Sequence, residues 1–504
     1  MTTPWLWSAA LGPLALLLAA SGDAVRFARP AAAFALLVAL AGLAGVIAFG
    51  PFATGTLGAA GIGFALDLDP LSAAMSALVA FVGLVVVAYS GPYLDGAPRQ
   101  RRFLRLLSAT LASVLLFILS GNLLQSWLAW FGASLALHGL LLFHPERRAG
   151  VLAARKKQIA SRLGDLALLV ALVFAYRGAG SLDLRAVLAA PPSPALAVAA
   201  VGLALAALVK SAQFPLHGWL LEVMETPTPV SALLHAGVLN AGGFLVLRYS
   251  PLIAGSPAAL DLLLVVGALT AAFGSLTLLP QTSIKGALAC STIAQMGFMM
   301  LECGLGVFSA AALHIFAHSL YKAHAFLSSG EAVGVHRALA PPPSVRGVLA
   351  VALAPALVGG AALLVGETAR QPGQLALAAI LALGLAPLFA QAARKRPGGA
   401  ELAGLVVSAG LIVALYLLLQ RLVAAAFASS LAPTPASPRE AIAAGLVVAL
   451  FAVLSLGQAL LPAFAERPFV RALRAHIANG FYVNTLVNRA LLRLWPTGPA
   501  PRAS

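Results

Sequence analysis

Long apolar runs alternate with short polar connections along almost the whole chain. A run of about 20 apolar residues is the length needed for a helix that crosses the hydrocarbon core of a bilayer. The pattern predicts about fourteen to fifteen such helices, near residues 5–21, 31–53, 70–91, 103–120, 122–143, 159–176, 196–225, 228–248, 258–279, 284–303, 308–330, 344–366, 375–393, 402–426 and 440–462. An amphipathic tail follows. The first run is expected to be a span and not a cleaved signal, because no basic segment precedes it. The fold class predicted is therefore an all-α polytopic membrane protein.

Composition supports a membrane protein and narrows its function. The 504 residues are 61% hydrophobic and only 10% charged, which is typical of polytopic membrane proteins. The net charge of +16 is dispersed through short loops, so it does not indicate a nucleic-acid partner. Two cysteines, Cys290 and Cys303, cannot build a disulfide framework, an iron–sulfur centre or a zinc ribbon within this chain.

Basic residues fall on alternate connections, as expected for loops that stay in the cytoplasm. They lie at Arg26 and Arg29, at Arg99, Arg101 and Arg102, in the run Arg147, Arg148, Arg155, Lys156 and Lys157, at Arg337 and Arg346, at Arg394, Lys395 and Arg396, and in the tail. The opposite loops, such as 54–69 and 251–257, carry almost none. We therefore expect a cell inner membrane protein with a periplasmic N-terminus and a cytoplasmic C-terminus.

One stretch, from Val209 to Arg248, concentrates polar chemistry in an otherwise apolar region. It contains Lys210, His217, Glu222, Glu225 and His235. A charged side chain at the centre of a membrane helix costs at least about 2.5–3.5 kcal/mol, so these groups need partners or water. Pro215, Pro227 and Pro229 also interrupt the helix and free backbone groups that lipid cannot satisfy. A broken helix with a buried lysine predicts an ion path.

Lys210 has no carboxylate within one turn, so its counter-charge must come from elsewhere. Glu225 and Asp165 are the candidates. Desolvation lowers the pKa of a lysine and a nearby carboxylate raises it, so a lysine subject to both can load and release a proton. His217 and His235 can relay that proton. Asp165 also stands three residues after Arg162, on the same helical face; this pair either anchors a helix end or tunes Lys210.

A second cluster recurs every four residues in H-I-F-A-H-S-L-Y-K at 314–322. His314, His318 and Lys322 therefore share one stripe of a helix, which favours a proton path. A zinc site on the two histidines is the alternative, although no third ligand is evident. Lys285 is expected either to join the path or to extend toward the cytoplasmic interface.

Three segments carry a resemblance to a known family: K-S-A-Q-F-P-L-H-G-W-L-L-E-V-M-E-T-P-T-P from Lys210, Q-T-S-I-K-G-A-L-A-C-S-T from Gln281, and H-I-F-A-H-S-L-Y-K-A-H from His314. They resemble the antiporter-like proton-conducting subunits of respiratory complex I and of multisubunit sodium/proton antiporters. The resemblance implies two inverted five-helix repeats and a line of buried lysines and histidines. Within this frame we expect N-terminal helices at 1–100, repeats at 101–250 and 251–400, C-terminal helices at 401–465 and an amphipathic cytoplasmic tail at 466–504.

Two departures from that family pattern stand out. Phe131 occupies the place of a glutamate that usually partners the broken-helix lysine, and no lysine-bearing segment follows Pro355. The fifth-helix segment W-F-G-A-S-L-A-L-H and the tail segment H-I-A-N-G-F-Y-V-N-T-L-V-N-R are most similar to membrane subunits of two-component inorganic carbon transporters. This similarity implies conduction of H⁺ or Na⁺, no catalysis or cofactor in this chain, and a cytoplasmic zinc partner resembling carbonic anhydrase.

Two other functions stay open at this point. The first is a sodium/proton antiporter or a proton-pumping subunit of a respiratory complex. The second is a membrane scaffold that only anchors an enzyme. The tail either docks a partner or lies in the membrane interface.

Overall fold

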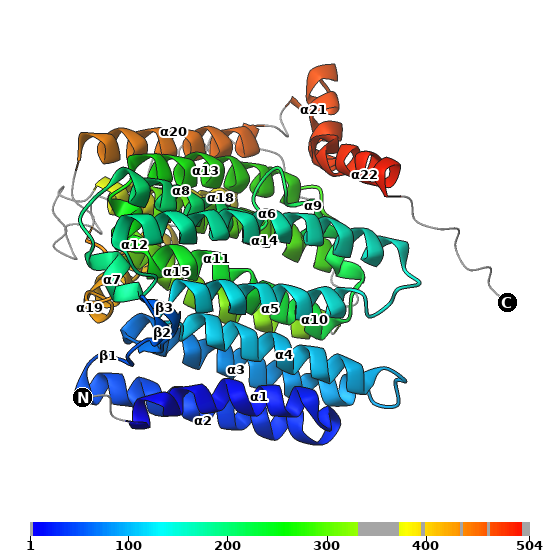
Figure 1. Ribbon diagram of the computed structural model, residues 1–504. Coiled ribbons are helices and arrows are strands. Elements are labelled where there is room, and N and C mark those ends of the chain that lie inside the picture. The colour runs from blue at the N-terminus through cyan, green and yellow to red at the C-terminus, as the bar shows by residue number, and fades with distance from the viewer. Residues whose placement is uncertain (1–3, 331–371, 395–398, 434–436, 461–463, 496–504) are drawn as a thin grey trace.

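The protein is a bundle of helices that lie side by side, with four short strands and the N-terminus at one end and α21 and α22 at the other (Figure 1). This computed structural model describes residues 4–330, 372–394, 399–433, 437–460 and 464–495. The helices are η1 (Pro4–Ala10), α1 (Leu11–Ser21), α2 (Ala24–Phe49), α3 (Pro70–Tyr93), α4 (Gln100–Ile118), α5 (Leu123–Leu141), α6 (Arg148–Ala179), α7 (Leu184–Ala189), α8 (Pro194–Lys210), α9 (Gly218–Glu222), η2 (Val223–Glu225), α10 (Thr228–Leu233), the π-helical η3 (Leu234–Val238), α11 (Asn240–Arg248), α12 (Ser250–Ala254), α13 (Pro257–Leu278), α14 (Ile284–Gly304), α15 (Phe308–Leu327), η4 (Ser328–Gly330), α18 (Pro372–Arg394), α19 (Gly399–Ala426), α20 (Pro438–Leu460), α21 (Pro468–Ala478), η6 (Gly480–Tyr482) and α22 (Val483–Leu494).

The all-α polytopic class is confirmed. Among the described residues, eight helices are long and apolar enough to cross a membrane, and shorter apolar helices stand beside them. Most predicted spans match an observed helix to within a few residues, for example α13 and α14. The span expected at 344–366 lies outside the described residues, as do Pro355 and its surroundings. The inverted repeats and the domain limits stay predictions.

Small residues bring some neighbouring helices close together. Along α13 and α14, a side chain added at Gly274 or at Gly297 would collide with the backbone of the facing helix. At Gly202 of α8 an added side chain would press tightly against Ala167 and Ala171 of α6. Membrane helices associate through such close backbone contacts because lipid offers no hydrophobic drive for helix pairing. These contacts fix α6 against α8, where the candidate site lies.

The end of the bundle that carries the strands is closed by a network of charges that the hydrophobic pattern does not predict. Strands β1 (Phe52–Ala53) and β4 (Asp67–Leu68) pair, as do β2 (Leu57–Ala59) and β3 (Ile62–Phe64). The buried guanidinium of Arg248 reaches Asp67 at 3.1 Å and Asp69 at 2.9 Å, and Arg185 reaches Asp67 at 2.6 Å. Asp69 also caps α3. This network ties the strand segment to the end of α11.

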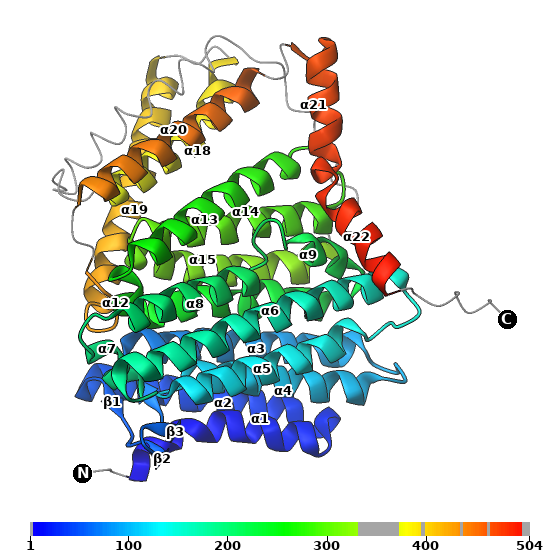
Figure 2. The same ribbon diagram turned by 45° about the horizontal axis from the view of Figure 1, so that its top comes forward.

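One predicted boundary is wrong in a way that matters for function. The sixth span was expected to begin at residue 159, with Lys156 and Lys157 in a cytoplasmic loop, whereas α6 begins at Arg148. The helix continues because nothing between Arg148 and residue 159 breaks it, and both lysine side chains turn inward and are buried. In Figure 2, α6 runs beside α8 toward α22. Helices α18, α19 and α20 gather on the side of the bundle away from α1 and α2.

Candidate ion-conduction site

The break predicted in the seventh span places Lys210 at the last turn of a helix. Helix α8 starts at a Ser193 cap and ends at Lys210. Beyond it, Ala212 adopts a left-handed backbone with φ of 50°, and Pro215 follows. A non-glycine residue in that region costs about 1–3 kcal/mol and is held there only by its surroundings. The chain therefore leaves the helical path next to the lysine.

The ammonium group of Lys210 is held by a serine and an aromatic ring. Its Nζ donates a hydrogen bond to Ser134 Oγ of α5 at 2.9 Å. It also lies 4.3 Å from the centre of the Trp130 ring. A cation over a buried indole face is stabilised by about 2 kcal/mol when desolvated. These two contacts stabilise the charged form of the half-buried Lys210.

A second lysine reaches the same serine. The Nζ of Lys157, one of the two buried lysines of α6, donates to the backbone carbonyl oxygen of Ser134 at 2.6 Å. Lys157 is only 3% exposed. Two lysines on neighbouring helices thus converge on one residue. Sequence reasoning had assigned Lys157 to a loop and had not singled out Ser134.

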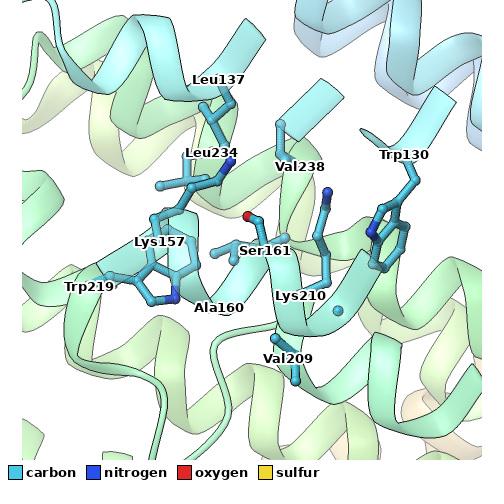
Figure 3. Close-up of a pocket in the computed structure, with 12 residues that line it drawn as sticks. Trp130, Leu137, Lys157, Ala160, Ser161, Val209, Lys210, Trp219, Leu234 and Val238 are labelled. Atoms are coloured by element: carbon cyan, nitrogen blue, oxygen red, sulfur yellow. The ribbon is translucent and has the colours of Figure 1, made fainter. Parts of the chain in front are cut away.

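A cavity of about 20 Å³ lies between these groups, lined by Trp130, Lys157, Ser161, Lys210 and Trp219 among others. Figure 3 shows the Lys210 side chain rising between Ser161 and Trp130, with Lys157 on the other side of Ser161. A cavity of this size can hold about one water molecule when polar groups line it. One water there would have two ammonium groups and a hydroxyl around it.

The predicted pair of Arg162 and Asp165 forms on α6, with Arg162 Nη2 3.0 Å from Asp165 Oδ2. The carboxylate is buried and the guanidinium half-exposed. Arg162 also lies 4.3 Å from the ring centre of Phe131, which in turn stacks on Trp127. Phe131 therefore supports the arginine of the pair, at the position where the family resemblance leads one to expect a glutamate. Lys210 makes its hydrogen bond to Ser134 and not to Asp165.

Polar contacts lead from Lys210 toward the second cluster. Ser211, next in the chain, donates to the carbonyl oxygen of Leu239 at 3.0 Å. The adjacent Asn240 donates to Ser319 Oγ of α15 at 2.7 Å. The π-helical turn η3 precedes Leu239 and carries His235. Such turns occur frequently at functional sites.

His235 of η3 joins the predicted second cluster, whose His314, His318 and Lys322 lie on α15, and we count it with that cluster from here on. His235 is fully buried and stacks on Phe326, with ring centres 4.3 Å apart. Lys322 donates to Ser291 Oγ at 2.6 Å and to the carbonyl oxygen of Leu288 at 3.0 Å. The rings of His314 and His318 lie 6.0 Å apart.

Unpartnered nitrogens mark this cluster. Among the described atoms, both ring nitrogens of His235 and the Nε2 atoms of His314 and His318 are buried without a hydrogen-bond partner. Buried polar atoms are nearly always paired with protein or ordered water. These nitrogens are therefore positions at which water or a transferred proton would be accommodated.

His314 has a partner that sequence reasoning missed. Its Nδ1 lies 2.9 Å from Oε2 of Glu302, a carboxylate that is 2% exposed near the end of α14. The signal available in the sequence was a lone acidic residue inside an apolar run, M-M-L-E-C-G. No three His, Cys, Asp or Glu side chains within the described residues come together as a metal site would require.

Three predicted residues lie at the end of the bundle opposite the strands. Lys285 donates to Thr228 Oγ1 at 3.1 Å. His217 is buried between Phe214 and Phe273, with its ring centre 4.5 Å from that of Phe273. The side chain of Glu225 lies outside the described part of the structure, so its pairing with Lys210 stays a prediction.

Glu222, on the neighbouring turn, connects α6 to the tail. Glu222 pairs with the buried Lys156 at 2.6 Å. It also accepts hydrogen bonds from Asn484 at 3.1 Å and Asn488 at 2.8 Å. Both asparagines belong to α22, so we call these four residues the tail clip. The clip fixes the amphipathic tail against α6 and α9.

Comparison with known proteins places this arrangement in a family. The chain is 40% identical over 440 residues to the probable inorganic carbon transporter subunit DabB2 of Halothiobacillus neapolitanus, covering 83% of this chain and 79% of that protein. Residues 120–339 match the family model described as NADH:quinone oxidoreductase/Mrp antiporter, TM. The chain belongs to the NADH:quinone oxidoreductase/Mrp antiporter family.

Other family members agree with this placement. Residues 56–104 match the model of the N-terminus of complex I chain 5. The probable inorganic carbon transporter subunit DabB of Hydrogenovibrio crunogenus is 37% identical, covering 82% of this chain and 80% of that protein. The Mrp complex of Dietzia sp. DQ12-45-1b superposes with a TM-score of 0.58 at 27% identity, covering 98% of this chain and 57% of that one. Lys157, Lys210, Glu302 and Lys322 all fall within the antiporter-family match.

Proposed function

We propose that this chain is the cation-conducting membrane subunit of an inorganic carbon uptake complex. The observation that carries the proposal is the convergence of Lys210 and Lys157 on Ser134 beside a helix break, in a chain related over most of its length to proteins named as inorganic carbon transporter subunits. Buried ionisable groups in membrane helices are costly and mark ion paths. Lys210 is the central proton carrier in this account.

The remainder of the path runs through the second cluster. Ser211 and Asn240 connect the Lys210 region to α15 through hydrogen bonds. From there the path continues through His235, His318 and Lys322, and both histidines carry buried ring nitrogens without a hydrogen-bond partner among the described atoms. A neutral imidazole accepts a proton at one nitrogen and donates from the other. The transported ion is H⁺. His217 and Lys285 carry it at the end of the bundle opposite the strands.

The energy of the ion is used by a bound partner. One charge that crosses 100 mV releases about 2.3 kcal/mol, which is between one and two powers of ten in an equilibrium constant. The partner is a DabA-like cytoplasmic zinc protein that hydrates CO₂ to bicarbonate. Catalysis and the zinc belong to that protein, so this chain is a transporter subunit and not an enzyme.

The basic end of the bundle faces the cytoplasm of the cell inner membrane. Arg99 precedes α4, and Arg101 and Arg102 lie in its first turn. Further basic residues begin α6, and the arginines of the tail lie at the same end (Figure 1). Cytoplasmic connections carry such an excess of basic residues. The C-terminus is therefore cytoplasmic, and the strand end is periplasmic.

Growth on limiting CO₂ tests this function. The chain and its partner are expressed in a host that lacks its own inorganic carbon uptake, and Lys210→Ala is compared with Arg101→Ala, an exposed basic residue. The proposal expects Lys210→Ala to abolish growth in air and Arg101→Ala to leave it unchanged. Wild-type growth of Lys210→Ala would overturn the assignment.

A sodium/proton antiporter is the second candidate, and the superposition with an Mrp complex favours it. Complementation of a salt-sensitive strain distinguishes the two. Rescue by this chain without its carbon-uptake partner would support antiport.

A further inference from the structure

The contact between Glu302 and His314 is the strongest feature that the path described above does not use. Glu302 is the lone carboxylate of the second cluster within the described residues, since His235, His318 and Lys322 are all basic. Its side chain is 2% exposed and that of His314 is 10% exposed. A buried carboxylate is costly unless a positive partner or a proton neutralises it.

A cavity with room for several water molecules lies beside this pair. It measures about 550 Å³ and is lined by side chains of α13, α14, α15, α18, α19 and α20. Its polar lining consists of Ser275, Gln295, Glu302, His314 and Tyr416, and the rest is apolar. A volume of this size has room for a cluster of water molecules beside its polar groups. Glu302, His314 and Tyr416 are the titratable groups that face it among the described residues.

The ring of His314 connects that cavity to the path. Its Nδ1 faces Glu302, while Nε2 is buried without a partner, and the His318 ring follows one turn along α15. Only Nδ1 is bound to Glu302, which leaves Nε2 available for a second proton transfer. An imidazole in this position can take a proton on one side and give one up on the other.

We propose that Glu302 and His314 form a proton-exchange site through which the second cluster takes up or releases H⁺ at the strand end of the bundle. This inference rests on the proposed function. In the uptake direction, a proton from cavity water binds the Glu302 carboxylate and is passed from Oε2 to Nδ1 of His314. The imidazole then releases the proton on Nε2 toward His318, so one proton enters and one leaves. The reverse sequence releases a proton.

Glu302→Gln tests the site in proteoliposomes that contain the chain and its partner. The amide keeps an oxygen that accepts a hydrogen bond from His314, but it binds no proton. We expect proton flux to fall about 100-fold, the lower end for loss of a positioned proton-transfer group. Glu302→Asp, which restores a carboxylic acid, is expected to recover part of the flux.

The matched control is Glu440→Gln, since Glu440 is also a buried carboxylate but accepts a backbone hydrogen bond from Gly373. It is expected to keep wild-type flux. Infrared difference spectra on a pH step should show a carboxylic-acid carbonyl band that is lost in Glu302→Gln and kept in Glu440→Gln.

The outcomes distinguish failure of the Glu302–His314 exchange site from failure of the proposed function. Loss of flux in both Lys210→Ala and Glu302→Gln, with loss of the infrared band, supports the site. Loss in Lys210→Ala alone, with the band kept in Glu302→Gln, overturns the site and leaves the proposed function standing. Full flux in both variants overturns both.

Discussion

At the scale of single residues, the chemistry rests on how one serine holds two lysines. Ser134 offers its hydroxyl to Lys210 and its backbone carbonyl to Lys157. Two ammonium groups held this close in a region of low dielectric repel each other, and transfer of one proton away relieves the repulsion. The geometry therefore suits a site that exchanges protons and does not only store charge.

Ser134→Ala separates the two contacts, because it removes the hydroxyl and keeps the carbonyl. Lys210 loses an acceptor whose hydrogen bond to a charged group contributes about 1.5–3 kcal/mol, and we expect proton flux to fall about tenfold or more. Fluorescence of a pH dye trapped in proteoliposomes measures it. Ser113→Ala is the control, because that hydroxyl bonds only to Ala109 within α4; equal flux in both variants would argue against a role for Ser134.

The sequence predicted part of this site and missed part, for physical reasons. Lys210 was identifiable because a proline-broken helix and a lysine in an apolar run are both costly in lipid. Lys157 and Ser134 were not, since a lysine near a basic loop is usually solvated and a serine within a helix is common. Their roles depend on how α5 and α6 are packed, which hydrophobic periodicity does not specify.

At the scale of elements, the tail clip links the amphipathic C-terminus to the region next to the candidate site. Lys156, which contributes to the clip, is adjacent in sequence to Lys157 on α6, and Glu222 lies on α9 just after the break. Tail residues such as Leu486, Leu494 and Trp495 remain exposed. The tail was predicted either to dock a partner or to lie in the interface, and α22 leaves an apolar surface for either.

Replacement of both clip asparagines, Asn484→Ala with Asn488→Ala, is expected to release α22. Each removes hydrogen bonds to a charged group, worth about 1.5–3 kcal/mol apiece, so hydrogen exchange of residues 483–494 should quicken at least about tenfold. The control is Asn479→Ala, whose side chain bonds only to Ala475 within the tail. Unchanged exchange in the double variant would show that the clip does not hold the helix.

The elements themselves were largely predictable, because a long apolar run in lipid has few alternatives to a helix. The strands at 52–68 were not, since they are two or three residues long and their pairing depends on contacts with the rest of the bundle. The inward turn of Lys156 escaped prediction for the same reason, because its carboxylate partner comes from a distant segment.

At the scale of the whole molecule, the direction of ion flow depends on which end of the bundle faces the cytoplasm. Single cysteines at Arg101→Cys and Ala59→Cys, both exposed positions, are introduced into a variant with both native cysteines replaced. A membrane-impermeant maleimide added to intact cells permeable only at the outer membrane should label the cysteine at position 59 and spare the one at position 101. The reverse labelling would invert the topology.

The central claim is that ions pass through Lys210, the half-buried lysine at the broken helix. The most direct measurement is proton flux into proteoliposomes that contain the chain and its partner, driven by a potassium diffusion potential, for wild type, Lys210→Ala and Arg101→Ala. The account predicts flux in wild type and Arg101→Ala and none above empty liposomes in Lys210→Ala, with all three proteins equally folded by circular dichroism. Wild-type flux through Lys210→Ala would contradict it.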